Sequence, residues 1–185
     1  MIGIFILLGF GLIVLISIVA MYNGLVRVKN HCDESWSDID TELKRRYNLI
    51  PNLVETVKGY AAYEKGVLEG VIQARNKAMA NNGTPVEQAK DENILIGGLR
   101  QLFALAESYP DLKANQNFLE LQKELSNTED RIQRTRRFYN GNVRDLSNRI
   151  EVFPSNIIAN IFGFQKREYF ELDDEAQRAV PRVEF

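Results

Sequence analysis

His31 and Cys32 are the residues of this sequence best suited to nucleophilic chemistry or zinc binding, and the chain has one residue of each type. A metal site or a Cys-His nucleophile needs such side chains to converge on one point. Adjacent residues of a helix point about 100° apart, so this pair would not share a helix face. Cys32 also falls at an apolar helical position, which is typical of a small buried hydrophobe.

Carboxylates are the other candidates for chemistry, and Asp38, Asp40 and Glu42 lie close together in sequence. Only Asp38 and Glu42 would be neighbours on a helix, and the Glu-x-x-His pairs of di-iron bundles are absent. No phosphate-binding loop, nucleophile elbow or dinucleotide fingerprint occurs either. We therefore expect no catalytic, cofactor-binding or metal-binding residue, no cofactor and no small-molecule substrate. The near-balanced net charge of -2 also argues against a nucleic-acid partner.

The segment from Ile2 to Met21 predicts a membrane anchor. It carries no charge, and 14 of its 20 residues are Leu, Ile, Val or Phe, enough to cross a hydrocarbon core of about 30 Å. A cleavable signal peptide would have a basic start, a shorter apolar run and a small-x-small cleavage site. We expect residues 1–22 to be a retained transmembrane helix.

Cations follow this segment and none precedes it. Arg27 and Lys29 come soon after the apolar run, and the positive-inside rule places such residues in the cytoplasm. The expected location is the cell (inner) membrane, with a single span, the N-terminus outside and the rest of the chain cytoplasmic.

The remaining chain has helical periodicity and no convincing strand alternation, which predicts an all-α fold. We expect an up-and-down four-helix bundle over residues 23–164, followed by an acidic C-terminal tail over residues 165–185. The first soluble helix would run from about Tyr22 to Arg46 and could simply continue the membrane helix. Asn48 and Pro51 favour a break before a second helix that ends near Ala80, although an apolar row at sevens through Pro51 favours one kinked helix.

The third helix has the clearest start, because Thr84, Pro85 and Glu87 form a capping box with proline at the first position. It should end before Pro110, and its Gly97 and Gly98 indicate close approach of a neighbouring helix or a distortion.

The fourth helix, from about Ala114 to Glu151, is the most regular element. An apolar row recurs every seven residues at Phe118, Leu125, Ile132, Tyr139, Leu146 and Phe153. The adjacent seam is partly polar, at Thr128, Thr135 and Asn142. These polar positions could fix register inside the bundle or mark a face for a partner chain.

A short apolar helix capped by Ser155 should follow Phe153-Pro154, and an up-and-down bundle would return it to the bilayer. It could lie in the membrane interface or pack over the open end of the bundle. Its candidate membrane-contact residues are Ile157, Ile158, Ile161, Phe162 and Phe164. Residues from Glu168 onward should form a loosely ordered tail.

Several stretches of this sequence resemble the LemA family over nearly the whole chain. They are Tyr22–Val26, Trp36–Asp40 and Leu43–Val54 in the first half, and Tyr109–Phe118, Phe138–Asn140, Phe153–Asn156 and Phe162–Phe164 in the second. The resemblance implies one N-terminal membrane helix, a short outer N-terminus and a four-helix bundle. It implies no established activity, although a relative in magnetosome-forming bacteria is associated with membrane invagination.

These observations favour a non-enzymatic, single-pass membrane protein whose bundle acts as a scaffold or self-assembly module. Its expected partners are the lipid bilayer and either further copies of the chain or other membrane proteins. A membrane-shaping assembly is the alternative, and a ligand-sensing bundle a less favoured one.

Overall fold

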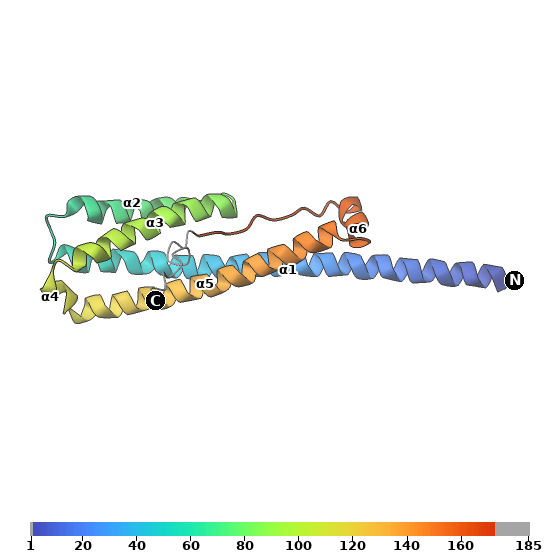
Figure 1. Ribbon diagram of the computed structural model, residues 1–185, viewed down its shortest axis with the longest axis horizontal. Helices are drawn as coiled ribbons and strands as arrows, with labels where there is room; N and C mark the ends of the chain where they lie inside the picture. Colours follow the sequence, from blue (N-terminus) through green and yellow to red (C-terminus); the bar gives the residue numbers. More distant parts are fainter. Residues whose placement is uncertain (1, 173–185) are drawn as a thin grey trace, which may run out of the picture. The chain divides into compact units, whose positions relative to one another are not determined.

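The computed structural model describes residues 2–172, and in this range every regular element is a helix (Figure 1). The predicted all-α class is confirmed. The helices are α1 (Ile2–Lys58), α2 (Lys65–Ala80), α3 (Pro85–Ala106), α4 (Pro110–Lys113), α5 (Gln116–Glu151) and α6 (Ser155–Ile161).

Helix α1 joins the apolar N-terminal segment to the rest of the chain without interruption. Among the described residues it is the one helix long and apolar enough to cross a membrane. The large apolar side chains between Ile2 and Val19 are exposed except for the half-buried Ile18, whereas Leu25 is fully buried. The sequence left open that the first soluble helix continues the predicted membrane helix, and the structure confirms this continuity.

The favoured break near Pro51 is wrong, because α1 continues to Lys58 and α2 begins only at Lys65. Proline lacks the N–H that would bond the carbonyl four residues earlier, which belongs to Tyr47. The structure supplies another donor, since Arg75 Nε of α2 donates to the Tyr47 carbonyl at 2.8 Å. The carbonyl orphaned by Pro51 is therefore satisfied from a neighbouring helix, and the helix can pass through the proline.

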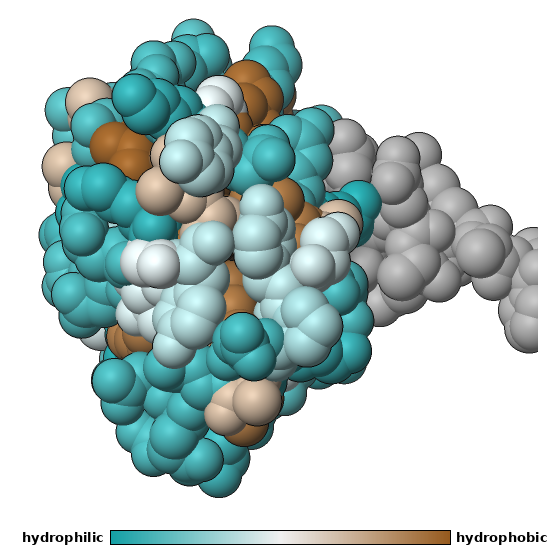
Figure 2. All heavy atoms as spheres, turned by 90° about the vertical axis from the view of Figure 1, so that its left-hand side faces the viewer, coloured by the Kyte–Doolittle hydropathy of each residue, from teal (hydrophilic) through white to brown (hydrophobic). Residues whose placement is uncertain are grey.

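The described chain forms two compact units, each containing parts of α1 and α5. Unit 1 consists of residues 2–39 and 134–169, and unit 2 of residues 40–133 and 170–172. The end of unit 2 seen in Figure 2 is covered mainly by hydrophilic side chains, with scattered hydrophobic ones.

Local sequence signals place the helices of unit 2. Thr84 Oγ1 accepts from the Glu87 N–H at 3.4 Å, and the Glu87 carboxylate accepts from the Thr84 N–H at 2.9 Å, which confirms the capping box. Gly98 allows α3 to approach α2, because an added Cβ would lie 3.4 Å from Val71 Cγ2. Gly97 has no such neighbour within 4 Å.

The apolar row of α5 is buried from Phe118 to Leu146, as its spacing predicts. Phe153, the last member of the row, lies beyond the helix and is 76% exposed.

In unit 1 the ring of Tyr139 packs on Trp36 of α1 with centroids 5.3 Å apart. The Tyr139 hydroxyl donates to the Glu168 carbonyl at 2.9 Å, so the beginning of the predicted tail is held against α5. Phe170 is buried in unit 2, and residues 173–185 lie outside the described part.

The Arg75 contact gives a direct test of why α1 is continuous. We expect Arg75→Met to lower the free energy of unfolding by about 1.5–3 kcal/mol, the range for a hydrogen bond from a charged donor. In a Pro51→Ala background the new N–H can bond the Tyr47 carbonyl, so the same substitution should cost clearly less. Circular dichroism of the four full-length proteins in detergent, unfolded by heat or denaturant, measures this cycle. Equal costs in both backgrounds would show that Arg75 does not replace the missing bond.

Candidate functional site

The candidate site lies in unit 1, where α5 ends and the chain turns into α6. The sequence predicts that Ser155 caps α6, but the structure assigns its hydroxyl to α5. Ser155 Oγ donates to the carbonyls of Arg149 at 2.7 Å and Val152 at 2.8 Å, and no side-chain cap is present at the start of α6. The last carbonyls of a helix lack backbone partners within that helix. The Ser155 hydroxyl supplies a donor to them at the end of α5.

The predicted membrane-contact residues divide between two environments. Ile158 is 5% exposed and packs inside unit 1, whereas Ile161 is 69% exposed and Phe162 54% exposed. The turn before α6 adds further exposed apolar side chains. We call the exposed set the α6 patch: Val152, Phe153, Ile157, Ile161 and Phe162.

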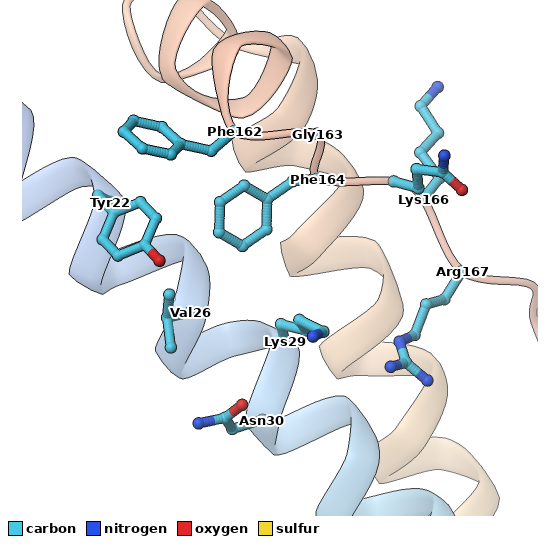
Figure 3. Close-up of a pocket in the computed structure, with 10 residues that line it drawn as sticks. Tyr22, Val26, Lys29, Asn30, Phe162, Gly163, Phe164, Lys166 and Arg167 are labelled. Atoms are coloured by element: carbon cyan, nitrogen blue, oxygen red, sulfur yellow. The ribbon is translucent and has the colours of Figure 1, made fainter.

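An aromatic cluster joins the α6 region to the end of the apolar stretch of α1. The ring of Tyr22 lies 4.7 Å from that of Phe162 and 5.9 Å from that of Phe164, measured between centroids. Both separations fall within the range of favourable aromatic pairs. In Figure 3 the three rings lie between α1 and the start of the segment that follows α6. The contact holds the α6 patch beside Tyr22, the residue that follows the apolar segment Ile2–Met21.

A groove of about 600 Å³ continues from the aromatic cluster along α1 (Figure 3). We call it the basic groove, because three of its lining side chains are cations and none is acidic. Its lining residues are Tyr22, Val26, Lys29 and Asn30 of α1 and the six residues from Phe162 to Arg167.

Two ion pairs hold the C-terminal wall of the groove. Lys166 pairs with Glu151, the last residue of α5, and Arg167 pairs with Asp33 of α1. Another cation lies nearby, since the Arg149 guanidinium covers Gly24, where an added Cβ would lie 2.7 Å from Arg149 Nη1. The sequence did not predict this arrangement, because residues 162–172 have no helical periodicity to place them.

The three residues of the predicted polar seam of α5 differ in burial and in hydrogen-bond partners. Asn142 Nδ2 donates to the His31 carbonyl at 3.2 Å and to Ser35 Oγ at 3.1 Å, both on α1 in unit 1. Thr128 is buried in unit 2 and donates to the Glu124 carbonyl of its own helix at 2.8 Å. Thr135 is half-buried. A partner chain bound at this seam remains a prediction.

The residues first considered for chemistry lie in different environments. Cys32 is fully buried, and burial raises the pKa of its thiol, which opposes formation of a nucleophilic thiolate. His31 is half-exposed and lies 3.5 Å from Glu34. Across residues 2–172 no group of three metal-binding side chains is close enough to hold an ion.

Sequence reasoning missed a buried polar cluster in unit 2, centred on Arg46. Its side chain is fully buried, and Nη1 bonds both carboxylate oxygens of Glu129 at 2.7 and 2.9 Å while Nη2 pairs with the buried Glu92. Tyr47 donates to Glu92, and Gln88 Nε2 donates to the same carboxylate at 2.7 Å. A signal existed: Arg46 lies in the buried stripe between Leu43 and Ile50, where a charge requires partners.

This cluster is suited to holding helices together and poorly suited to proton transfer. Burial lowers the pKa of Arg46, but the charges of Glu129 and Glu92 offset this effect and leave the pKa raised. Burial, followed by the charge of Glu92, also raises the pKa of the Tyr47 hydroxyl. Both groups therefore keep their protons at neutral pH, and the cluster connects α1, α3 and α5 as a fixed network.

Removal of one charge from this cluster should destabilise unit 2. We expect Glu92→Gln to lower the free energy of unfolding by about 2–4 kcal/mol, somewhat less than loss of a whole buried pair because Glu129 remains. Glu69→Gln on the exposed face of α2 removes the same charge and should leave stability nearly unchanged. Thermal unfolding of both full-length variants in detergent measures the difference, and equal stabilities would contradict a structural role.

Comparisons with known proteins agree with the residues that carry the resemblance. The LemA family profile matches residues 35–185. Protein LemA of Metamycoplasma hominis is 30% identical over 160 residues, which cover 82% of this chain and 72% of that protein. Magnetosome protein MamQ 2 of Paramagnetospirillum magneticum is 26% identical over 175 residues, and MamQ of Magnetospirillum gryphiswaldense 25% identical over 174. The matches cover about 80% of this chain and 64% of each MamQ protein. The profile covers most of the chain and a named LemA protein is 30% identical to it, so the chain belongs to the LemA family.

Proposed function

We propose that this protein is a single-pass membrane protein whose helical domain lies on the bilayer surface and acts there as a non-enzymatic scaffold. The observation that carries the proposal is the α6 patch, attached by the Tyr22–Phe162 ring contact to the end of the membrane-crossing stretch. A patch of exposed apolar side chains next to a lipid anchor suits the boundary between headgroups and acyl chains.

Charge supports a cytoplasmic position for the domain. Arg27 and Lys29 follow the apolar stretch in sequence, and the fold adds Arg149, Lys166 and Arg167 to the same end of unit 1. Cations beside a span favour the cytoplasmic face. The proposed location is the inner membrane, with the N-terminus outside.

The scaffold part of the proposal rests on surfaces available for assembly. Unit 2 carries an apolar groove of about 590 Å³ between the end of α1 and the start of α2, floored by Val54, Leu68 and Ile72. Its lining also carries both signs of charge, from Lys58 and Lys65 and from Glu55 and Glu69. Such a mixed lining can pair with an acidic or basic surface of a second copy or of another membrane protein.

Membrane shaping is the second candidate, and the α6 patch favours it specifically. Apolar side chains inserted at one interface expand a single leaflet, which bends a membrane when many copies assemble.

Contact between the α6 patch and lipid can be measured by depth-dependent quenching. A fluorophore on Ile161→Cys, in a Cys32→Ser background, should be quenched strongly by brominated acyl chains in reconstituted bilayers. The control label is Arg137→Cys, an exposed position of α5 about 20 Å from Glu151 at 1.5 Å per residue. Equal quenching at the two positions would exclude the proposed membrane contact.

Assembly should be detectable in native membranes. We expect cross-linking followed by mass spectrometry to recover either dimers and larger complexes of this chain or defined neighbouring membrane proteins. Leu68→Glu with Ile72→Glu places charges in the apolar groove of unit 2 and should reduce these products, whereas Met79→Glu, exposed on α2, should not. A chain that stays monomeric at every concentration and captures no neighbour would contradict the scaffold.

A further inference from the structure

We propose that the basic groove of unit 1 binds the headgroup phosphate of an anionic phospholipid. This inference rests on the proposed membrane position of unit 1 and adds a specific ligand to it. The groove combines aromatic rings at one end with Lys29, Lys166 and Arg167 along its walls, and no acidic side chain lines it. An aromatic surface followed by a cationic one matches a phospholipid, in which the apolar chains adjoin the anionic phosphate.

The position of the groove along α1 fits the headgroup layer. Tyr22 directly follows the apolar stretch Ile2–Met21, and Lys29 lies eight residues after Met21, about 12 Å further along a helix. Helical side chains tilt toward the N-terminus, and long lysine side chains extend toward the phosphates. The headgroup layer is roughly 5–7 Å thick on each side of the hydrocarbon core, so the amine of Lys29 can reach it.

The cations of the groove keep donors available for a phosphate. Arg167 uses Nη2 to pair with Asp33, but a guanidinium has five N–H donors in a fixed fork. Lys166 pairs with Glu151 and points away from the rings in Figure 3. Lys29 has no ion pair with any of the residues in the described range. Lys29 and Arg167 are therefore the principal candidates for binding the phosphate. Lys29 has no ion pair among residues 2–172, and the Arg167 guanidinium can bind two anions at once.

A lipid is favoured over free phosphate for two reasons. The aromatic cluster makes no favourable contact with a small inorganic anion, but it can pack against the glycerol and first methylenes of a lipid. The anchor also keeps the groove among lipid headgroups permanently, so their effective concentration is high.

Lipid binding to the full-length protein in detergent tests the inference, with native mass spectrometry counting bound molecules. Wild type should retain phosphatidylglycerol in preference to phosphatidylcholine. Lys29→Gln should weaken phosphatidylglycerol binding about fivefold, the effect of one cation near an anionic lipid surface, and should weaken phosphatidylcholine binding less, because the choline cation already offsets the charge of that phosphate. Lys123→Gln, an exposed lysine of α5 in unit 2, removes the same charge and should have no effect.

A second variant addresses the ion pair that positions Arg167. Asp33→Asn frees the guanidinium without removing it, so phosphatidylglycerol binding should be maintained or strengthened. Arg167→Gln in the same background should weaken binding, although the Asp33 pair is absent in both proteins. If these two variants bind phosphatidylglycerol equally, Arg167 is not part of the site.

Three results would overturn the headgroup site. They are equal retention of the two lipids by wild type, equal losses in Lys29→Gln and Lys123→Gln, and complete displacement of phosphatidylglycerol by inorganic phosphate. The last would identify a free-anion site. Quenching of the Ile161 label separates this failure from failure of the proposed function, because membrane contact by the α6 patch does not require headgroup selectivity.

Discussion

The uncharged stretch from Ile2 to Met21 continues without interruption into the part of α1 that packs in unit 1, and this continuity constrains the residues around it. A helix advances 1.5 Å per residue, so in the proposed membrane position the depth of the apolar stretch sets the depth of Tyr22 and Lys29. Phe162 and Phe164 pack on Tyr22, and they bring α6 to the same level. The apolar patch, the aromatic cluster and the basic groove thus follow from one rigid element. Their order along α1, apolar then aromatic then basic, is the order of a bilayer surface.

Unit 2 buries charged side chains, whereas the cations of unit 1 line an open groove. Arg46 is fully enclosed and is compensated by Glu92 and Glu129. A buried ion pair is weak evidence for added stability, because desolvation offsets much of the attraction. Its stronger effect is on register, since sliding α1 against α3 or α5 would leave a buried charge without a partner. We therefore infer that the cluster favours the one register of α1, α3 and α5 in which Arg46 is paired.

The sequence predicted what local signals determine and missed what distant partners determine. The apolar stretch, the capping box at Thr84 and the buried row of α5 depend on neighbours within a few turns, and all were predicted. The continuity of α1 was not, because the donor that replaces the Pro51 N–H comes from Arg75, 28 residues from Tyr47. Arg46 was predicted as the end of the first soluble helix and not as a buried charge, because its partners lie 46 and 83 residues away. The basic groove could not be predicted because its second wall is an irregular segment placed by ion pairs.

The account requires that the apolar stretch is retained in the functional protein and crosses the bilayer. Mass spectrometry of the chain isolated from native membranes, after alkaline extraction, tests this requirement most directly. We predict that the chain stays in the membrane pellet, is released only by detergent, and contains Ile2–Met21 joined to the helical domain. A chain that begins after residue 20, or that alkaline treatment releases into solution, would contradict the membrane position of α6 and of the groove.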